Sequence, residues 1–143
     1  MAKLGKPRST KGLAVLCAKV AENKIAKNIL LLNLTAIDSA PADYFVICSC
    51  DSDNQIRAVV GEIESTCRDL GIQKPKIEGL HESASWVLAD FFDVVMHIML
   101  PTARSFYQLE KLWGDAEFKK VDEAGKTKAV KLDEIKMMYL ERE

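Results

Sequence analysis

Four side chains that can carry chemistry lie close together in the segment CSCDSDNQ, residues 48–55: Cys48, Cys50, Asp51 and Asp53. Cysteine thiolates are zinc ligands, and a pair of carboxylates can hold the Mg²⁺ ions of a phosphoryl-transfer enzyme. A buried strand that runs into a capped helix has the same composition. Which of these the segment forms decides whether the chain is an enzyme.

A zinc site at this segment would lack ligands. Structural zinc takes about four ligands, and Cys-x-Cys on an extended strand presents only its own two thiols to one face. His81 and His97 are not at metal-ligand spacing from the cysteines or from each other. We therefore expect Cys48 and Cys50 to be small buried strand residues, and we predict no metal and no other cofactor.

The two aspartates fit a helix start better than a catalytic metal site. Ser52 and Gln55 match the Ser-x-x-Gln capping box, and acidic groups at a helix N-terminus complement its dipole. The sequence has no Gly-x-Ser-x-Gly elbow, no P-loop and no dinucleotide fingerprint. We predict that the chain is not an enzyme. The alternative is a nucleotidyltransferase that acts through Asp51 and Asp53 with bound metal.

Composition and charge indicate one compact domain. The chain has 143 residues, of which 48% are hydrophobic and 29% are charged, and its formal net charge is −1 at pH 7. Binding to nucleic acid requires a surplus of Lys and Arg on one face, so we expect little direct nucleic-acid contact. A rival hypothesis is an assembly scaffold that touches RNA through the basic N-terminal arm, which carries Lys3, Lys6, Arg8 and Lys11.

The cysteines and the apolar runs predict a cytoplasmic protein with free thiols. All four cysteines lie inside apolar segments, no secretory signal precedes them, and runs such as NILLLNL are too short to cross a bilayer.

Hydrophobic periodicity predicts an α/β domain with a mixed sheet. Helices are expected at about residues 10–23, 52–70 and 102–113, and strands within residues 27–35, 43–49, 75–79, 85–90 and 93–100. The third helix is expected to turn Phe106, Leu109, Leu112 and Trp113 inward. Beyond Gly114, lysines alternate with acidic residues and apolar residues become sparse. We therefore divide the chain into a domain, residues 1–114, and a charged C-terminal tail, residues 115–143, partly disordered or carrying a short helix.

The last two predicted strands form an antiparallel hairpin, because few residues separate them. If Asp90 pairs with Asp93 across a tight turn, Trp86 lies opposite His97. Both faces of this hairpin are largely apolar, and the predicted helices are too few to cover the sheet twice. The face that carries Trp86 is therefore either a protein-binding surface or buried by helices or by a second copy of the chain.

In this order and spacing, the motifs DYFVICS, SDNQIRA, EGL, WVLADFFDVVMHI and RSFYQLEKLW resemble the ribosomal silencing factor (RsfS) family, also called Iojap-like. The resemblance covers roughly residues 10–115. It implies a nucleotidyltransferase-like topology without catalytic residues, in which the helices lie mainly on one face of the mixed sheet.

The resemblance also implies a function in translation regulation. Family members bind the large ribosomal subunit on its fourteenth protein, block its association with the small subunit, and repress translation under nutrient limitation. An assembly factor for the large subunit that uses the same docking site is the alternative. Apart from the resemblance, a homodimer of the free protein through the same open sheet face is a further hypothesis, and it would compete with ribosome binding. Carried over by motif, the expected partner-binding residues are Trp86, Asp90, Met96 and His97, whereas the residues assigned mainly to the fold are Tyr44, Arg104, Tyr107, Glu110 and Trp113.

The chain departs from the family pattern in the hairpin turn. Relatives commonly have Gly where this chain has Phe92, and Gly where it has Cys50. Because Phe resists the positive φ of a two-residue turn, we expect a turn that is longer or differently shaped.

Overall fold

A computed structural model describes residues 4–135 of the chain. Its strands are β1 (Lys27–Asn33), β2 (Tyr44–Ser49), β3 (Lys76–Glu78), β4 (Trp86–Asp90), β5 (Val94–Met99), β6 (Glu117–Val121) and β7 (Thr127–Val130). Its helices are α1 (Thr10–Asn23), α2 (Asp53–Leu70), α3 (Pro101–Tyr107), α4 (Leu109–Leu112) and α5 (Leu132–Ile135). None of these helices is long and apolar enough to cross a membrane.

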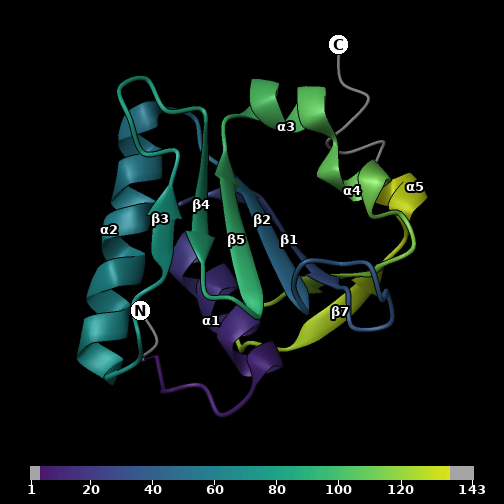
Figure 1. Ribbon diagram of the computed structural model, residues 1–143, viewed down its shortest axis with the longest axis horizontal. Helices are drawn as coiled ribbons and strands as arrows, with labels where there is room; N and C mark the ends of the chain where they lie inside the picture. The colour runs from purple at the N-terminus through teal and green to yellow at the C-terminus, as the bar shows by residue number, and fades with distance from the viewer. Residues whose placement is uncertain (1–3, 136–143) are drawn as a thin grey trace.

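The strands form a seven-stranded mixed sheet in the order β3-β4-β5-β2-β1-β6-β7 (Figure 1). The neighbours β2 and β5 are parallel, and every other neighbouring pair is antiparallel. The prediction of an α/β domain with a mixed sheet is confirmed.

The two long helices, α1 and α2, cover one face of the sheet. Ser9 caps α1 by accepting a hydrogen bond from the Gly12 amide at 2.9 Å, and Gly71 ends α2 in the left-handed conformation at φ 68°. The apolar stripes of both helices pack on every second residue of the central strands, for example Val46, Cys48, Val87, Ala89, Met96 and Ile98. These helices form the main helical layer.

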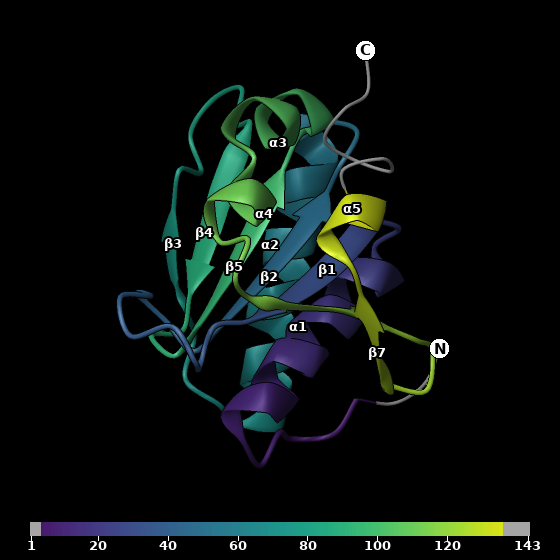
Figure 2. The same ribbon diagram turned by 90° about the vertical axis from the view of Figure 1, so that its right-hand side faces the viewer.

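The opposite face is covered only in part. The short helices α3, α4 and α5 group near one end of the sheet (Figure 2), where Ala103, Leu109 and Ile135 pack on strand residues such as Phe45 and Ile47. No described helix lies over β3 and β4 on this face (Figure 1). The surface that the sequence analysis singled out lies in this uncovered region.

Residues 117–135 differ from the expected loose tail. β6 pairs with β1, placing Phe118 opposite Leu32, and β7 pairs with β6. Phe118 and Ile135 are buried in the second core. The tail prediction is therefore wrong for this segment, although α5 agrees with the expected short helix. The lysines in these short strands obscured the alternation of apolar and polar residues that predicts a strand. The rest of the expected tail, residues 136–143, lies outside the described residues.

The third predicted helix is broken in two at Gln108. This residue adopts the left-handed conformation, with φ 48° and ψ 58°, and separates α3 from α4. The break changes which side chains face the sheet. Leu109 is buried, but Phe106 and Leu112 are 79% and 69% exposed. The predicted inward stripe is therefore wrong at Phe106 and Leu112.

Candidate partner-binding face

The two cysteines of the opening segment are buried at the end of β2. Cys48 and Cys50 point to the face that α1 and α2 cover, and both thiols are free. A hydrogen bond between them raises the pKa of Cys48, which burial also raises, and lowers the pKa of Cys50. A thiol held protonated is a poor metal ligand. Within residues 4–135, no group of three His, Cys, Asp or Glu residues is placed to hold a metal ion.

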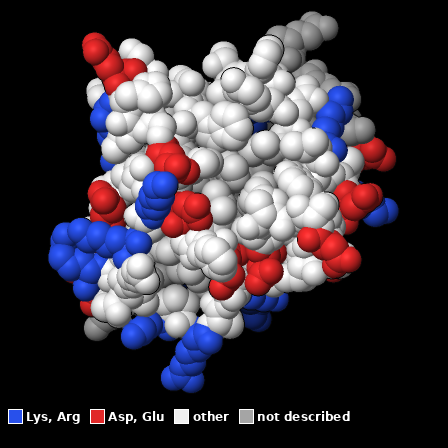
Figure 3. Space-filling view, viewed as in Figure 1, with Lys and Arg blue, Asp and Glu red and all other residues white. Residues whose placement is uncertain are grey.

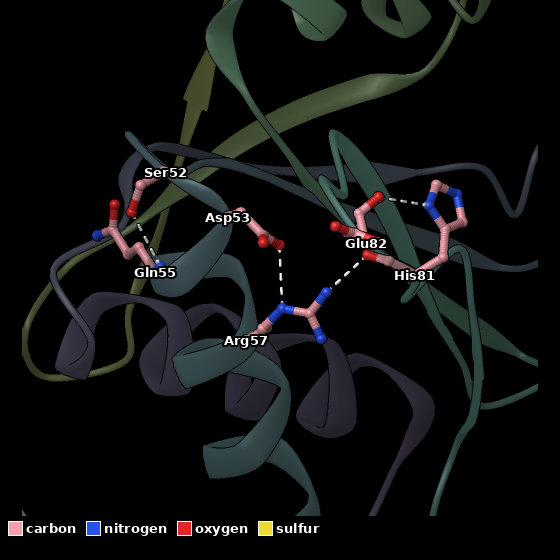
Figure 4. A network of polar contacts seen from close by, with 6 residues as sticks. All are labelled: Ser52, Asp53, Gln55, Arg57, His81 and Glu82. Atoms are coloured by element: carbon pink, nitrogen blue, oxygen red, sulfur yellow. Dashed lines mark hydrogen bonds and ion pairs between the residues drawn. The ribbon is translucent and has the colours of Figure 1, made fainter.

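The segment that follows caps α2, as predicted. The Ser52 hydroxyl accepts a hydrogen bond from the Gln55 amide at 3.1 Å (Figure 4). The Gln55 side-chain oxygen accepts from the Asp51 amide at 2.6 Å, so the reciprocal bond reaches one residue further back than in the usual capping box.

The two aspartates of this segment point to separate cations. The Asp53 carboxylate accepts from Arg57 Nε at 3.1 Å, and Arg57 in turn donates to the His81 carbonyl (Figure 4). The Asp51 carboxylate lies 3.6 Å from Lys27 Nζ. Each carboxylate therefore serves a local ion pair, and the described geometry does not bring them together on one ion.

The β4–β5 hairpin has a different register from the one predicted. Trp86 lies opposite Met99, Leu88 opposite His97 and Asp90 opposite Val95. The predicted pairing of Trp86 with His97 is wrong by two residues, because Asp90 pairs with Val95 instead of Asp93 and the turn closes one residue further along, where the Phe91 amide donates to the Val94 carbonyl at 2.8 Å. The turn is differently shaped, as one of the two expected outcomes had it, although Phe92 does adopt a positive φ. A shift of two leaves each side chain on its predicted face.

Phe92 is the distinctive residue of this turn. It adopts a positive φ of 76° and is 83% exposed. The Asp90 carboxylate accepts a hydrogen bond from the Phe92 amide at 2.8 Å, which holds the turn in the manner of an Asx turn. Asp90 is predicted to bind the partner, and this hydrogen bond shows that it also stabilises the turn.

Trp86 and His97 make contact across the diagonal of the hairpin. The Trp86 indole N–H donates to His97 Nδ1 at 3.1 Å. His97 is only 5% exposed, and burial lowers its pKa to about 3. Because Nδ1 accepts, the neutral ring carries its proton on Nε2, which has no hydrogen-bond partner among the described atoms. His97 lies beneath Trp86 and supports it from the core.

Two aromatic residues missed by the sequence analysis complete the surface. The Tyr107 ring lies 4.6 Å from the Trp86 ring and 5.0 Å from the Phe106 ring, centroid to centroid. Tyr107 is 52% exposed, so burial does not support its assignment mainly to the fold. We call Trp86, Leu88, Phe106 and Tyr107 the aromatic face. Its helical part was hidden because the break at Gln108 has no local glycine or proline signal.

Met96 does not belong to this surface. It is fully buried among the residues that pack under α1 and α2, on the opposite side of the sheet. The expectation that Met96 faces a partner is therefore wrong. Successive side chains of a β-strand point to opposite faces of the sheet, so Met96 and its neighbour His97 cannot share a face. The assignment by family motif did not take this alternation into account.

A buried ion pair fastens the helices that carry Phe106 and Tyr107. Arg104 Nε donates to the Glu110 carboxylate at 2.8 Å, and the two side chains are 2% and 0% exposed. Arg104 also donates to the Asn28 carbonyl and to the Ser49 hydroxyl. This network joins α3 and α4 to β1 and β2, in agreement with the structural role predicted for Arg104 and Glu110.

The surroundings of the aromatic face resemble a protein-binding surface. Figure 3 shows uncharged side chains across the upper middle of this side of the molecule, with Asp and Glu to the left, below and to the right of them. An apolar centre with aromatic residues and a charged rim is typical of protein interfaces.

Comparison with known proteins agrees with this geometry. A family model described as "Ribosomal silencing factor during starvation" matches residues 7–138. A ribosomal silencing factor of Bacillus subtilis is 44% identical over 112 residues, which cover 78% of this chain and 93% of that protein. A mouse protein named for mitochondrial assembly of the ribosomal large subunit is 39% identical over 74 residues, covering 50% of this chain and 32% of its own. A crystal structure from Chromobacterium violaceum is 31% identical, with a TM-score of 0.68, and the match covers 74% of this chain and 87% of the other.

Proposed function

Because the chain belongs to the ribosomal silencing factor family, we propose that it represses translation by occupying the subunit-joining surface of the large ribosomal subunit. The names of its relatives support a ribosome-associated silencing role. The proposed docking site on the ribosome is the fourteenth large-subunit protein. Bound there, the chain would block the small subunit by its volume alone.

The observation that carries this proposal is the exposed aromatic face. Tyr107 and Phe106 are exposed to solvent, and the Tyr107 ring contacts both the Phe106 ring and the Trp86 ring. Aromatic anchors of this kind contribute a large share of binding energy at protein interfaces. Asp90 lies on the same strand face as Trp86 and Leu88 and would supply a charged rim contact, and His97 would act by holding the indole in place.

This mechanism requires affinity and volume, and no catalytic step. Relatives are named as silencing factors and not as enzymes. We therefore assign no reaction to Asp51 and Asp53.

The test is sedimentation of purified small and large subunits at joining magnesium, with the wild-type chain or its variants added. We expect the wild type to travel with the large subunit and keep the subunits apart. Tyr107→Ala and Trp86→Ala should each weaken binding by about 2 kcal/mol, roughly thirtyfold. Ile25→Ala is the matched control, because Ile25 is an exposed apolar residue after α1, on the other side of the sheet, and its loss should change nothing.

A thermal melt of each variant separates docking from folding. Tyr107 and Phe106 are exposed, so their alanine variants should melt like the wild type. Trp86 is half-buried and hydrogen-bonded, so its variant can lose some stability. Full affinity of a folded Tyr107→Ala, Phe106→Ala double variant would contradict docking through the aromatic face.

The alternative function is large-subunit assembly through the same face. The name of the mouse relative supports it. The same sedimentation experiment decides between them: if the wild type travels with the large subunit while joining proceeds normally, an assembly role replaces silencing.

A further inference from the structure

The positive charge of this chain is unevenly placed. The net charge is only −1, yet Figure 3 shows Lys and Arg gathered at the lower left, over the N-terminal arm and β3. Lys6, Arg8 and Lys11 come from the arm and the first turn of α1, and Lys74 and Lys76 from the segment entering β3. Lys76 pairs with Glu78 at 3.5 Å, whereas the other four form no ion pair with a described residue.

The same region holds a cavity of about 700 Å³. The arm and α1 form one wall, the segment between α2 and β3 a second, and the β4–β5 turn a third. Lys74 and Lys76 line it directly, and the cations of the arm alternate with lining residues such as Pro7 and Ser9. The volume is in the range of known ligand sites.

Phe92 lines this cavity in an unfavourable conformation. A large side chain at positive φ is strained, and glycine would satisfy the same turn without strain. The ring nevertheless stays 83% exposed, so packing does not explain it. Single-stranded nucleic-acid sites combine exposed aromatic rings, on which bases stack, with cations beside the phosphates, and here the cations that line the cavity with Phe92 are Lys74 and Lys76.

The cavity also contains two carboxylates, which limit the kinds of ligand that could bind in it. Asp90 and Asp93 line it and would repel a free phosphate or an acidic peptide. A nucleotide chain avoids this conflict, because base amino groups donate to carboxylates while the backbone follows the lysines. The cations are also spread along an edge of the molecule and do not converge on one point.

We propose that this cavity binds a segment of single-stranded RNA, with Phe92 stacking on a base, Lys74 and Lys76 beside the phosphates, and Asp90 and Asp93 accepting from base amino groups. The inference goes beyond docking through the aromatic face. It revises the expectation of little nucleic-acid contact, which rested on the net charge. It also extends the rival hypothesis of an RNA-touching arm by adding the cavity, the ring and the β3 lysines.

The test is fluorescence anisotropy of a labelled single-stranded RNA of mixed sequence with the full chain across a salt series. For the wild type, the logarithm of the binding constant should fall linearly with the logarithm of the salt concentration. The double variant Lys74→Ala, Lys76→Ala should bind more weakly and lower the salt slope by about 0.7 for each phosphate that is no longer neutralised. Phe92→Ala should weaken binding by roughly fivefold to a hundredfold.

Matched controls decide whether the site is specific. Lys126→Ala with Lys128→Ala removes the same charge from the β6–β7 hairpin, at the opposite edge of the sheet. Phe106→Ala removes a ring of similar exposure from the aromatic face. Both should leave RNA affinity within about twofold of the wild type.

Any of the following results would overturn the inference: absence of RNA binding by the wild type, an equal weakening in the hairpin control, an unaffected Phe92→Ala, or equal affinity for an RNA duplex. Circular dichroism of each variant confirms its fold, which substitution at these exposed positions should not disturb. Failure of RNA binding is separable from failure of ribosome docking, because Phe106→Ala should weaken only the docking and Phe92→Ala only the RNA affinity.

Discussion

At the scale of single residues, the contact between Trp86 and His97 links the core to the surface. His97 is buried and neutral, and its Nδ1 accepts a hydrogen bond from the indole above it. The ring also packs edge-on against Phe45, with centroids 4.5 Å apart. The orientation of Trp86, and so the shape of the aromatic face, depends on this imidazole remaining uncharged.

We predict that His97 makes stability depend on pH. Burial lowers its pKa from 6.5 to about 3 in the folded chain. Between these two pH values the unfolded chain binds more protons than the folded chain. The contribution of His97 to the free energy of unfolding is therefore fully present above pH 6.5 and is lost as pH falls toward 3. The free energy of unfolding should fall by up to about 1.4 kcal/mol for each pH unit in this range. Urea unfolding of the wild type and of His97→Phe at several pH values measures it.

The comparison is clearest above pH ~5, where most carboxylates keep their charge. The variant should show a flatter pH profile than the wild type in that range. Identical profiles would mean that His97 takes up a proton in the folded chain without hindrance.

The Arg104–Glu110 pair gives a second prediction at this scale. Arg104→Met leaves the Glu110 carboxylate buried without its cation, which should lower the free energy of unfolding by about 3–5 kcal/mol. Adding Glu110→Leu removes the uncompensated charge and should restore part of this stability. Urea denaturation of both variants is the measurement, and a double variant no more stable than the single one would contradict the argument.

At the scale of elements, the aromatic face depends on where α3 ends and β4 begins. α3 ends at Gln108, which leaves Phe106 and Tyr107 outside the core, and β4 begins at Trp86, which packs partly buried against Tyr107 at the margin of the second core. β6 has the opposite effect toward the other edge of the sheet, because it covers the edge of β1 and buries Phe118 in the second core.

The division of the chain after Gly114 stays a prediction, and the pairing of β6 gives a way to test it. A chain that ends at Gly114 would expose the edge of β1 and the apolar partners of Phe118 and Ile135. We expect a lower melting temperature and a tendency to aggregate, with a larger destabilisation than Phe118→Ala causes alone. Thermal melts with light scattering measure both. A truncated chain as stable as the full one would favour an independent domain of residues 1–114.

At the scale of the whole molecule, the two proposed sites adjoin at Asp90 and otherwise use different residues. The aromatic face combines β4 with α3, whereas the cavity lies among the N-terminal arm, β3 and the β4–β5 turn. Asp90 ends the strand that begins with Trp86 and also lines the cavity. A large ribosomal subunit offers both protein and RNA, so one molecule could engage both at once.

The exposed aromatic face also predicts the state of the free protein. Two copies that join through this face would form a twofold-symmetric dimer and bury the same rings that the ribosome would take. Sedimentation velocity should show a dimer for the wild type and a monomer for Phe106→Asp, and added large subunits should dissolve the dimer. A monomer at every concentration would leave ribosome docking as the only proposed use of the face.

The sequence by itself determined most of the elements and the meaning of the opening segment. The capped start of α2 at Ser52, its end at Gly71 and the burial of Cys48 follow from patterns within a few residues. Local signals of this kind hold because periodicity, caps and turn residues act on neighbouring backbone groups. The family motifs belong to the same class of information, because they are contiguous in the chain.

Only the tertiary structure decided the register of Trp86 against Met99, the exposure of Phe106 and the place of β6 beside β1. Each depends on contacts between residues far apart in the chain or on a break without a local signal. The gathering of Lys74 and the N-terminal arm beside Phe92 is of the same kind, since total charge says nothing about where charges lie. Folding brings such residues together through the packing of the whole sheet, which no short window of sequence contains.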